Sequence, residues 1–524
     1  MSSGSTTFGH PAGFVAFVGA GPGDEGLLTL RGADLLSRAD AVVLDQEAYG
    51  SLLRHCREGV EVVDAAEEDA ARRAVAAAKA GRHVVRLCAG DPMFFSSVTE
   101  EVAACAEAEV DFEIVPGVPP ATAVLAYAGI PAATSVPEFR VVDAAVVDDW
   151  STHAASAGTL VIYNGIAEAV AIGKALVAAG RPDTTPVAIS SAGTTTEQYT
   201  VATTLGRMAP DLKHAGMTEP GLIVVGEAVG MRERLSWFET KPLFGWRVLV
   251  PRTKEQSAGL VEQLRSYGAV PEEVPTISVE PPRTPQQMDR AIKGLVTGRY
   301  EWVAFTSANA VKAVREKFEE YGLDARAFAG LKVAAVGEAT ARALVEFGVK
   351  PDLTPSGEQS SEGLVAEWPP YDSMLDPINR VLLPRADIAT ETLVAGLTEL
   401  GWECDDVTAY RTVRAAPPPA PVREAIKGGG FDAVLFTSSS TVRNLVGIAG
   451  KPHNVTVIAV IGPQTAKTAE EFGLRVDVMA DTASVSALAA GLAEYGAKLR
   501  QAALAAGEVP RRPSQNRRGA RRRK

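Results

Sequence analysis

Short apolar runs alternate with longer amphipathic segments along most of the chain, and glycine-rich turns separate many of them. The first example covers residues 15–36, where four apolar residues lead into a glycine-rich turn and an apolar-periodic segment follows. This order predicts a strand, a tight turn and a helix. Because the alternation continues, with helical stretches of about 10–15 residues, we expect an α/β protein with parallel sheets.

The turn at residues 19–24, GAGPGD, differs from the dinucleotide-binding fingerprint. Its third glycine, Gly23, comes one residue early, and Asp24 places a negative charge where a pyrophosphate would bind. We therefore expect that this turn does not hold a phosphate. A plain turn between a strand and a helix is the alternative to any ligand-binding role.

The second half of the chain contains an internal duplication at a lag of roughly 130 residues. The matched segments are RVLVPR at 247–252 with RVLLPR at 380–385, FTS at 305–307 with FTS at 436–438, and VGEATA at 336–341 with IGPQTA at 461–466. Three matches in the same order predict two lobes that share one doubly wound α/β fold.

Both lobes place hydroxyl groups and helix N-termini where strands are predicted to end. Backbone amides at helix N-termini bind anions, so a ligand held between the two lobes would suit a polycarboxylate. For any single Ser or Thr, capping of a helix is the alternative role. The candidate substrate contacts are Arg252, Thr306, Ser307, Gly337, Thr340, Arg385, Thr437, Ser438, Ser439, Gly462 and Thr465.

Composition narrows the class of protein. The chain has 524 residues, 46% hydrophobic and 22% charged, which predicts a globular protein of about two to four domains. The four cysteines and six histidines show no metal-binding spacing, so we expect no metal site. Without a long apolar stretch or an apolar leader, we expect a cytoplasmic protein with no membrane partner.

The C-terminal end is strongly basic although the formal net charge of the chain is −12. The final segment, RRPSQNRRGARRRK at 511–524, lacks acidic residues and interleaved aromatic residues. We expect residues 496–524 to form a disordered tail and do not expect nucleic acid as a partner.

Residues 246 to about 495 resemble uroporphyrinogen-III synthase in the FTS and G-x-x-T-A segments and in Tyr410, Arg411 and Thr412. The resemblance implies two lobes, about 246–279 plus 412–495 and about 283–405, joined by a two-stranded connector. It also implies cyclisation of hydroxymethylbilane to uroporphyrinogen III, with inversion of the last ring, loss of water and no cofactor. Tyr410 would then assist departure of the terminal hydroxyl as a general acid. A tyrosine that only packs between the lobes is the alternative.

Residues 14–240 resemble the tetrapyrrole methylases, most of all uroporphyrinogen-III C-methyltransferase, in five ordered blocks. The blocks begin VGAGPGDEG, VVRLCAGDP, IVPGVPP, AGTTTEQ and PGLIVVG. The resemblance implies two α/β subdomains, a homodimer formed through this half, and methylation with S-adenosylmethionine toward precorrin-2, sirohaem and cobalamin. The implied functional residues are Asp45 as general base, with cofactor contacts at Pro22, Ala89, Gly90, Asp91, Phe94, Pro119, Pro120, Asn164 and Gly193.

Several positions depart from the methylase pattern. Ala89, Pro119 and Asn164 replace residues that form the family's cofactor pocket, an acidic stretch at 67–69 replaces a lysine segment, and residues 95–97 replace a glycine-arginine loop. Three hypotheses follow. The chain is a synthase fused to an active methyltransferase, a synthase fused to a binding or scaffolding module, or a tandem ligand-binding protein without chemistry. The expected domains are 14–240 and 241–495, after a flexible segment at 1–13.

Overall fold

The computed structural model describes residues 13–44, 47–64, 70–94, 98–215, 217, 220–252 and 254–519. These residues form four five-stranded sheets. They divide into two compact units. The first comprises residues 1–246, 263–270 and 493–510, and the second comprises 247–262, 271–492 and 511–524. The chain is an α/β protein, as its sequence pattern predicts.

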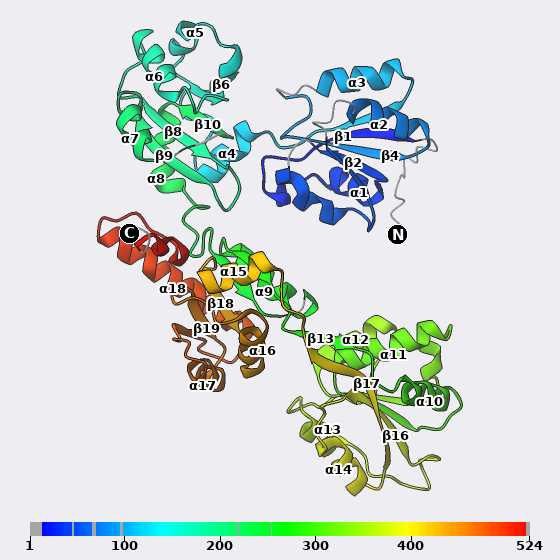
Figure 1. The fold of residues 1–524 in the computed structure, drawn as a ribbon. Coiled ribbons are helices and arrows are strands. Elements are labelled where there is room, and N and C mark those ends of the chain that lie inside the picture. Colours follow the sequence, from blue (N-terminus) through cyan, green and yellow to red (C-terminus); the bar gives the residue numbers. More distant parts are fainter. Residues whose placement is uncertain are drawn as a thin grey trace. The chain divides into compact units, whose positions relative to one another are not determined.

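The first sheet of the N-terminal half is parallel, with the order β3-β2-β4-β1-β5. Alternate residues of β1 belong to two apolar clusters: Ala16 packs with helix α1, and Val15 packs with α2 and α3. Figure 1 shows α1 and α3 on opposite sides of this sheet. The elements are β1 (Phe14–Gly19), β2 (Ala41–Leu44), β3 (Glu61–Asp64), β4 (His83–Cys88), β5 (Asp111–Val115), α1 (Leu30–Arg38), α2 (Ala70–Lys79) and α3 (Val98–Glu107).

The second sheet of this half has the order β6-β7-β10-β8-β9. Strands β6 and β7 are parallel, whereas the other neighbours pair antiparallel. Two α/β subdomains are therefore present, as expected. The elements are β6 (Phe139–Asp143), β7 (Thr159–Tyr163), β8 (Pro186–Ser191), β9 (Tyr199–Thr204), β10 (Gly221–Val225), α4 (Pro120–Ala128), α5 (Ser151–Ala154), α6 (Ala169–Ala178), α7 (Met208–Ala215) and α8 (Arg232–Leu235).

The third sheet uses chain segments from both ends of the C-terminal half, in the order β12-β11-β18-β19-β20. Strand β11 pairs in parallel with β18. In this pairing Val248 aligns with Ala433 and Leu249 aligns with Val434. The elements are β11 (Arg247–Val250), β12 (Val270–Glu273), β18 (Ala433–Phe436), β19 (Val457–Val460), β20 (Val478–Met479), α9 (Lys254–Ser266), α15 (Ala420–Gly428), α16 (Ser439–Ala449), α17 (Pro463–Glu471) and α18 (Val485–Ala505).

The fourth sheet has the order β13-β17-β16-β14-β15 and contains the segments VPTISVEPP (274–282) and VTAYRTVRAAPP (407–418), which resemble the two connector strands of the synthase. They pair antiparallel, from Ile277 with Arg414 to Glu280 with Arg411. The elements are β13 (Ile277–Glu280), β14 (Trp302–Phe305), β15 (Lys332–Ala335), β16 (Arg380–Ala386), β17 (Glu403–Arg414), α10 (Pro285–Val296), α11 (Ala308–Glu320), α12 (Glu338–Phe347), α13 (Ser361–Glu367) and α14 (Thr392–Glu399).

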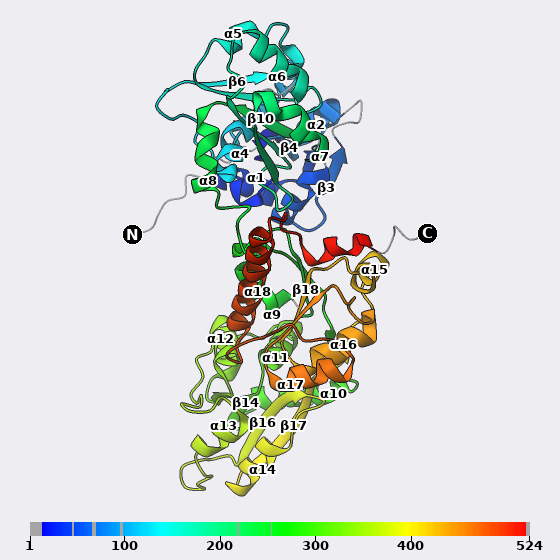
Figure 2. The same cartoon turned by 90° about the vertical axis from the view of Figure 1, so that its left-hand side faces the viewer.

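Helix α18 extends past residue 496, which contradicts the expected disordered tail for residues 496–505. Helix α18 continues to Ala505, and Figure 2 shows it as one continuous helix. The segment at 496–505 is rich in Ala, Leu, Lys, Arg and Gln, which favour helix. Farther on, the Ser514 amide donates a hydrogen bond to the fully buried Asp432 carboxylate at 2.8 Å.

No described helix is long and apolar enough to cross a membrane. Among the same residues, no group of His, Cys, Asp and Glu side chains is arranged to hold a metal ion.

Candidate functional site

Three glycine-containing turns meet at the carboxyl ends of β1, β4 and β5. Gly21 and Gly90 exchange backbone hydrogen bonds of 3.2 and 3.0 Å. A Cβ atom added to Gly117 would lie 2.0 Å from the Gly90 carbonyl oxygen, and Gly90 itself has a φ of +61°. A side chain at Gly117 would occupy the space of the neighbouring backbone, whereas glycine is favoured at Gly90 because of its left-handed φ.

The Asp91 carboxylate holds two of these turns together. It accepts hydrogen bonds from the amides of Met93 at 2.8 Å and Gly117 at 3.0 Å. The sequence predicts Asp91 as a cofactor contact, and that role stays a prediction. What the contacts establish is that Asp91 fixes the loop after β4 against the loop after β5.

Aromatic and amide side chains stand beside these turns. The Phe94 ring is 37% exposed, and its centroid lies 6.4 Å from that of Tyr163. Burial raises the pKa of Tyr163 to about 12, and its hydroxyl accepts a hydrogen bond from the Ala121 amide at 2.7 Å. Next in the chain, Asn164 has a φ of +52° and donates to the Asp143 carboxylate at 3.1 Å.

A strained loop of the second subdomain lies against the 19–24 turn. Gly193 stands between Ala192 (φ +48°) and Thr194 (φ +64°), in a region that side-chain-bearing residues rarely adopt. The Thr194 hydroxyl accepts a hydrogen bond from the Asp24 amide at 3.1 Å. Backbone strain of this kind is often found at functional sites, so this junction of the two subdomains is the candidate cofactor site.

Several of the predicted cofactor residues are thus brought together. Gly90 contacts the 19–24 turn that carries Pro22, and Phe94 lies near Tyr163, the residue that precedes Asn164. Ala89 is exposed. Asp45, the acidic stretch at 67–69 and the segment at 95–97 lie outside the described residues.

Tyr127 belongs to this site although sequence reasoning missed it. Its hydroxyl donates a hydrogen bond to the Asp24 carboxylate at 2.6 Å, and that carboxylate also accepts from the Gly26 amide at 2.8 Å. The sequence carries half of this contact, because Asp24 is an unusual charge for such a turn. Its partner could not be found, because it lies in a helix more than a hundred residues away.

In the C-terminal half, Tyr410 and Ser307 come together at the carboxyl edge of the fourth sheet. Their hydroxyl oxygens are 2.9 Å apart. Ser307 also caps helix α11, where its side chain accepts from the Ala310 amide at 3.2 Å. Tyr410 is 7% exposed and is aligned with Ala386 in the pairing of β16 and β17. The Tyr410 hydroxyl therefore lies at the N-terminus of helix α11.

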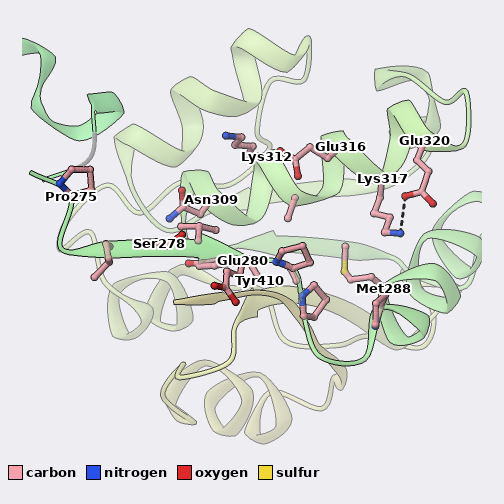
Figure 3. Close-up of a pocket in the computed structure, with 17 residues that line it drawn as sticks. Pro275, Ser278, Glu280, Met288, Asn309, Lys312, Glu316, Lys317, Glu320 and Tyr410 are labelled. Atoms are coloured by element: carbon pink, nitrogen blue, oxygen red, sulfur yellow. Dashed lines mark hydrogen bonds and ion pairs between the residues drawn. The ribbon is translucent and has the colours of Figure 1, made fainter. Parts of the chain in front are cut away.

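A cavity of about 710 Å³ borders Tyr410. Figure 3 shows Lys312 and Glu316 on helix α11 along one side, with Ser278 on the strand opposite. Prolines and other apolar side chains make up much of the remaining wall. The cavity that Tyr410 borders can therefore accept an organic ligand that has both apolar and charged parts.

Among the other predicted contacts, the caps of the duplicated lobes are accessible. Ser438 caps helix α16 in a reciprocal capping box with Thr441. Gly462, at the start of α17, has open space where a side chain would stand, whereas Gly337 faces the Gln359 side chain at 3.2 Å. Capping, the alternative role for these hydroxyl groups, therefore holds for Ser307 and Ser438. Thr306, Thr437 and Ser439 are partly exposed at the same helix starts.

Three predicted substrate contacts are buried, and we withdraw their side chains from the site. Thr340 and Thr465 are each 4% exposed and pack inside their lobes. The Arg385 side chain is also 4% exposed, with Nε 2.6 Å from Asp406 Oδ1 and a second ion pair to the same carboxylate. Arg252, its duplicate, has no ion-pair partner among the described residues, and burial lowers the pKa of its guanidinium.

Arg385→Met is accordingly expected to destabilise the protein by about 2 kcal/mol, because it leaves Asp406 without the charged donors that it holds in the fold. The KM for the open-chain substrate should not change. Chemical denaturation and steady-state kinetics measure the two quantities. A raised KM without loss of stability would restore Arg385 to the substrate site.

Comparisons with known proteins match the two halves of the chain to two different families. Residues 258–490 match the family described as uroporphyrinogen-III synthase HemD, and residues 15–209 match the tetrapyrrole (corrin/porphyrin) methylases. The chain thus joins a tetrapyrrole methylase domain to a uroporphyrinogen-III synthase domain. It is 32% identical over 511 residues to "Porphyrin biosynthesis protein HemD" of Ruminiclostridium josui, a match that covers 92% of this chain and 98% of that protein. The chain belongs to this HemD family of porphyrin biosynthesis proteins.

Other relatives match one half only. "Siroheme synthase 1" of Klebsiella pneumoniae is 40% identical over 244 residues, which cover 43% of this chain and 51% of that protein. A solved uroporphyrin-III C-methyl transferase from Thermus thermophilus, complexed with S-adenyl homocysteine, is 31% identical, with a TM-score of 0.37, and covers 42% of this chain and 99% of that one. A uroporphyrinogen III synthase from the same organism is 20% identical, with a TM-score of 0.33, and covers 48% of this chain and 99% of that one.

Proposed function

We propose that the C-terminal half converts hydroxymethylbilane to uroporphyrinogen III and that the N-terminal half then methylates this product with S-adenosylmethionine. The observation that carries the first step is the contact between Tyr410 and Ser307, 2.9 Å apart beside a cavity and at the start of helix α11. The comparisons support both steps, because the two family models match the two halves of this chain and one relative of 32% identity matches along both halves.

In the first reaction, the terminal C–O bond of the bilane breaks and the departing oxygen leaves as water. Tyr410 would donate its phenolic hydrogen to that oxygen, as a general acid does. Ser307 would hold the phenol in place. The last pyrrole ring attacks the electron-deficient carbon that remains through the ring carbon that carries its existing bridge, which gives a spiro intermediate. The old bridge bond then breaks, and the bridge carbon forms a new bond to the other α-carbon of this ring, so that the ring is inverted. The proton on that α-carbon is lost when the aromatic system is restored. One molecule of water is lost overall.

Most of the remaining catalysis would be positional. A flexible polycarboxylate must be folded so that its two ends meet, and the contacts that bind its side chains offset the lost entropy. Backbone amides at the starts of α11, α12, α16 and α17 are suited to carboxylates, as is the guanidinium of Arg252. The proposed contacts are Arg252, Thr306, Ser307, Gly337, Thr437, Ser438, Ser439 and Gly462.

The N-terminal site fits S-adenosylmethionine in its chemistry. Met93 is 57% and Phe94 37% exposed beside three close-packed turns, and an aromatic face attracts a sulfonium cation. When bound, the cofactor supplies an electrophilic methyl group. Ala89, Gly90 and Gly193 would hold it through their backbone groups, with Pro22, Phe94 and Asn164 as walls and Asp91 fixing the turns. Asp45 remains the proposed base.

The full-length protein, supplied with hydroxymethylbilane, is expected to form uroporphyrinogen III, and labelled S-adenosylmethionine should add two methyl groups to it. Separation of the isomers by chromatography and mass measurement of the product check both steps. Isomer III without methyl groups would favour the scaffolding role of the N-terminal half. Isomer I alone, at the spontaneous rate, would mean that the chain is only a binding protein.

The organisation of the molecule in solution is also a proposal. We propose domains at 14–240 and 241–495, a homodimer formed through the N-terminal half, and a cytoplasmic location. The basic C-terminal end is proposed to bind no nucleic acid. The synthase half is proposed to need no cofactor.

A further inference from the structure

A buried amide side chain connects the strained loop of the methylase half to the segment that leads into the synthase half. Gln198 is 3% exposed. Its Oε1 accepts a hydrogen bond from the Thr194 amide at 2.7 Å, and its Nε2 donates to Glu239 Oε1 at 2.8 Å. Both ends of the amide are therefore occupied, and the side chain has one orientation that satisfies both partners.

Glu239 is the anchor of this connection. Its carboxylate also accepts from Thr200 at 2.7 Å and from Arg232 at 2.8 Å. Arg500, on helix α18, donates to the Glu239 carbonyl oxygen at 2.7 Å. A carboxylate with three donors, one of them a neutralising arginine, is fixed in position, because each donor would be left unpaired if it moved.

The loop that Gln198 holds needs such a support. Thr194 is a β-branched residue at φ +64°, and this conformation persists only where the surroundings impose it. Thr194 is 2% exposed, so its amide would be buried without a partner if Gln198 were removed. On its other side, the Thr194 hydroxyl accepts from the Asp24 amide. Hydrogen bonds thus run without interruption from Glu239 to the 19–24 turn.

We propose that Gln198 and Glu239 are positioning residues for S-adenosylmethionine. They hold the 192–195 loop in its strained form, so that Gly193 and the 19–24 turn are in place before the cofactor arrives. This inference rests on the proposed methyl transfer by the N-terminal half. A loop that is already ordered costs less free energy to bind to, so loss of the support appears as weaker cofactor binding.

The first test is the Gln198→Met substitution in the full-length protein, which removes both hydrogen bonds at nearly constant volume. S-adenosylhomocysteine serves as the probe, and its Kd is measured by titration calorimetry below the unfolding temperature. We expect the Kd to rise about tenfold in Gln198→Met. Glu239→Gln keeps an acceptor oxygen for Gln198 but places an amide nitrogen against Arg232, so the Kd should rise by a smaller factor than in Gln198→Met. Gln501→Met, the same change at an exposed position of α18, is the matched control and should not change the Kd.

The outcomes separate the inference from the proposed function. If the unaltered protein does not bind S-adenosylhomocysteine, methyl transfer and positioning both fail. If it binds and folded Gln198→Met binds equally well, Gln198 is only structural and the positioning role fails. Hydrogen exchange on the unaltered protein gives a test that needs no variant. The peptide covering 192–198 should be protected before the probe is added, and rapid exchange there would overturn the proposal.

Discussion

Tyr410→Phe is expected to slow the formation of uroporphyrinogen III by about 100-fold, at the lower end of the range for general acid catalysis. The phenol is the proton donor whose place is fixed by Ser307, 2.9 Å away. Without it, the terminal hydroxyl leaves without a proton donor. A larger share of the substrate then closes spontaneously to isomer I. The initial rate and the ratio of the two isomers measure the effect.

Tyr300→Phe is the matched control for this experiment. Tyr300 lies just before strand β14 of the same sheet and is also buried, with an exposed fraction of 2%. Its hydroxyl donates a hydrogen bond to Asp405 at 2.6 Å. Its loss should lower stability without changing the isomer ratio, because the hydroxyl is not at the proposed site. An unchanged rate in Tyr410→Phe would leave the tyrosine as a packing residue only.

Gly117→Ala is expected to destabilise the methylase half by about 3 kcal/mol, the upper end for overpacking. The added Cβ would lie 2.0 Å from the Gly90 carbonyl oxygen, and backbone on both sides leaves no flexible group to move. Binding of S-adenosylhomocysteine should be lost, whereas formation of isomer III should continue. Denaturation followed by calorimetry and the synthase assay report on the two halves separately.

Gly230→Ala provides the contrast for this substitution. Gly230 has no atom within 4 Å of the position that its Cβ would take. The same chemical change in the same half should therefore leave stability and cofactor binding nearly unaltered. Equal effects of both substitutions would show that the close approach of the three turns is not the cause.

The fold could be predicted from the sequence because its signals are local. The apolar runs that become β1 and β11 are bounded by glycine and proline, and the duplication shows that a second copy of the same unit follows. The contact between Ser307 and Tyr410 was not predictable in this way. It depends on the register of β16 against β17, which aligns Ala386 with Tyr410. Register is decided by the packed sheet and not by either strand alone.

The duplication does not predict which partner each charged side chain has. Arg252 and Arg385 occupy matched positions, yet among the described residues only Arg385 has an ion-pair partner in its lobe, Asp406. In the other lobe the matched acid, Glu273, accepts a hydrogen bond from Ser257. A repeat in sequence predicts the same backbone, whereas the partner of each charged side chain depends on neighbours that have diverged. The same holds for the end of the chain, where overall charge suggested disorder and helix-forming residues continued α18.

The first compact unit includes residues 263–270 and 493–510, although both lie in the C-terminal half of the sequence. Leu243 and Gly245 donate backbone hydrogen bonds to Tyr267 and Gly268, and Arg500 donates to Glu239. A gene split at the joint between the halves would therefore encode an N-terminal product with missing packing partners. Any attempt to produce the methylase as a stand-alone enzyme has to carry these two remote pieces along, and proteolysis near residue 500 should weaken the half that lies far upstream in the chain.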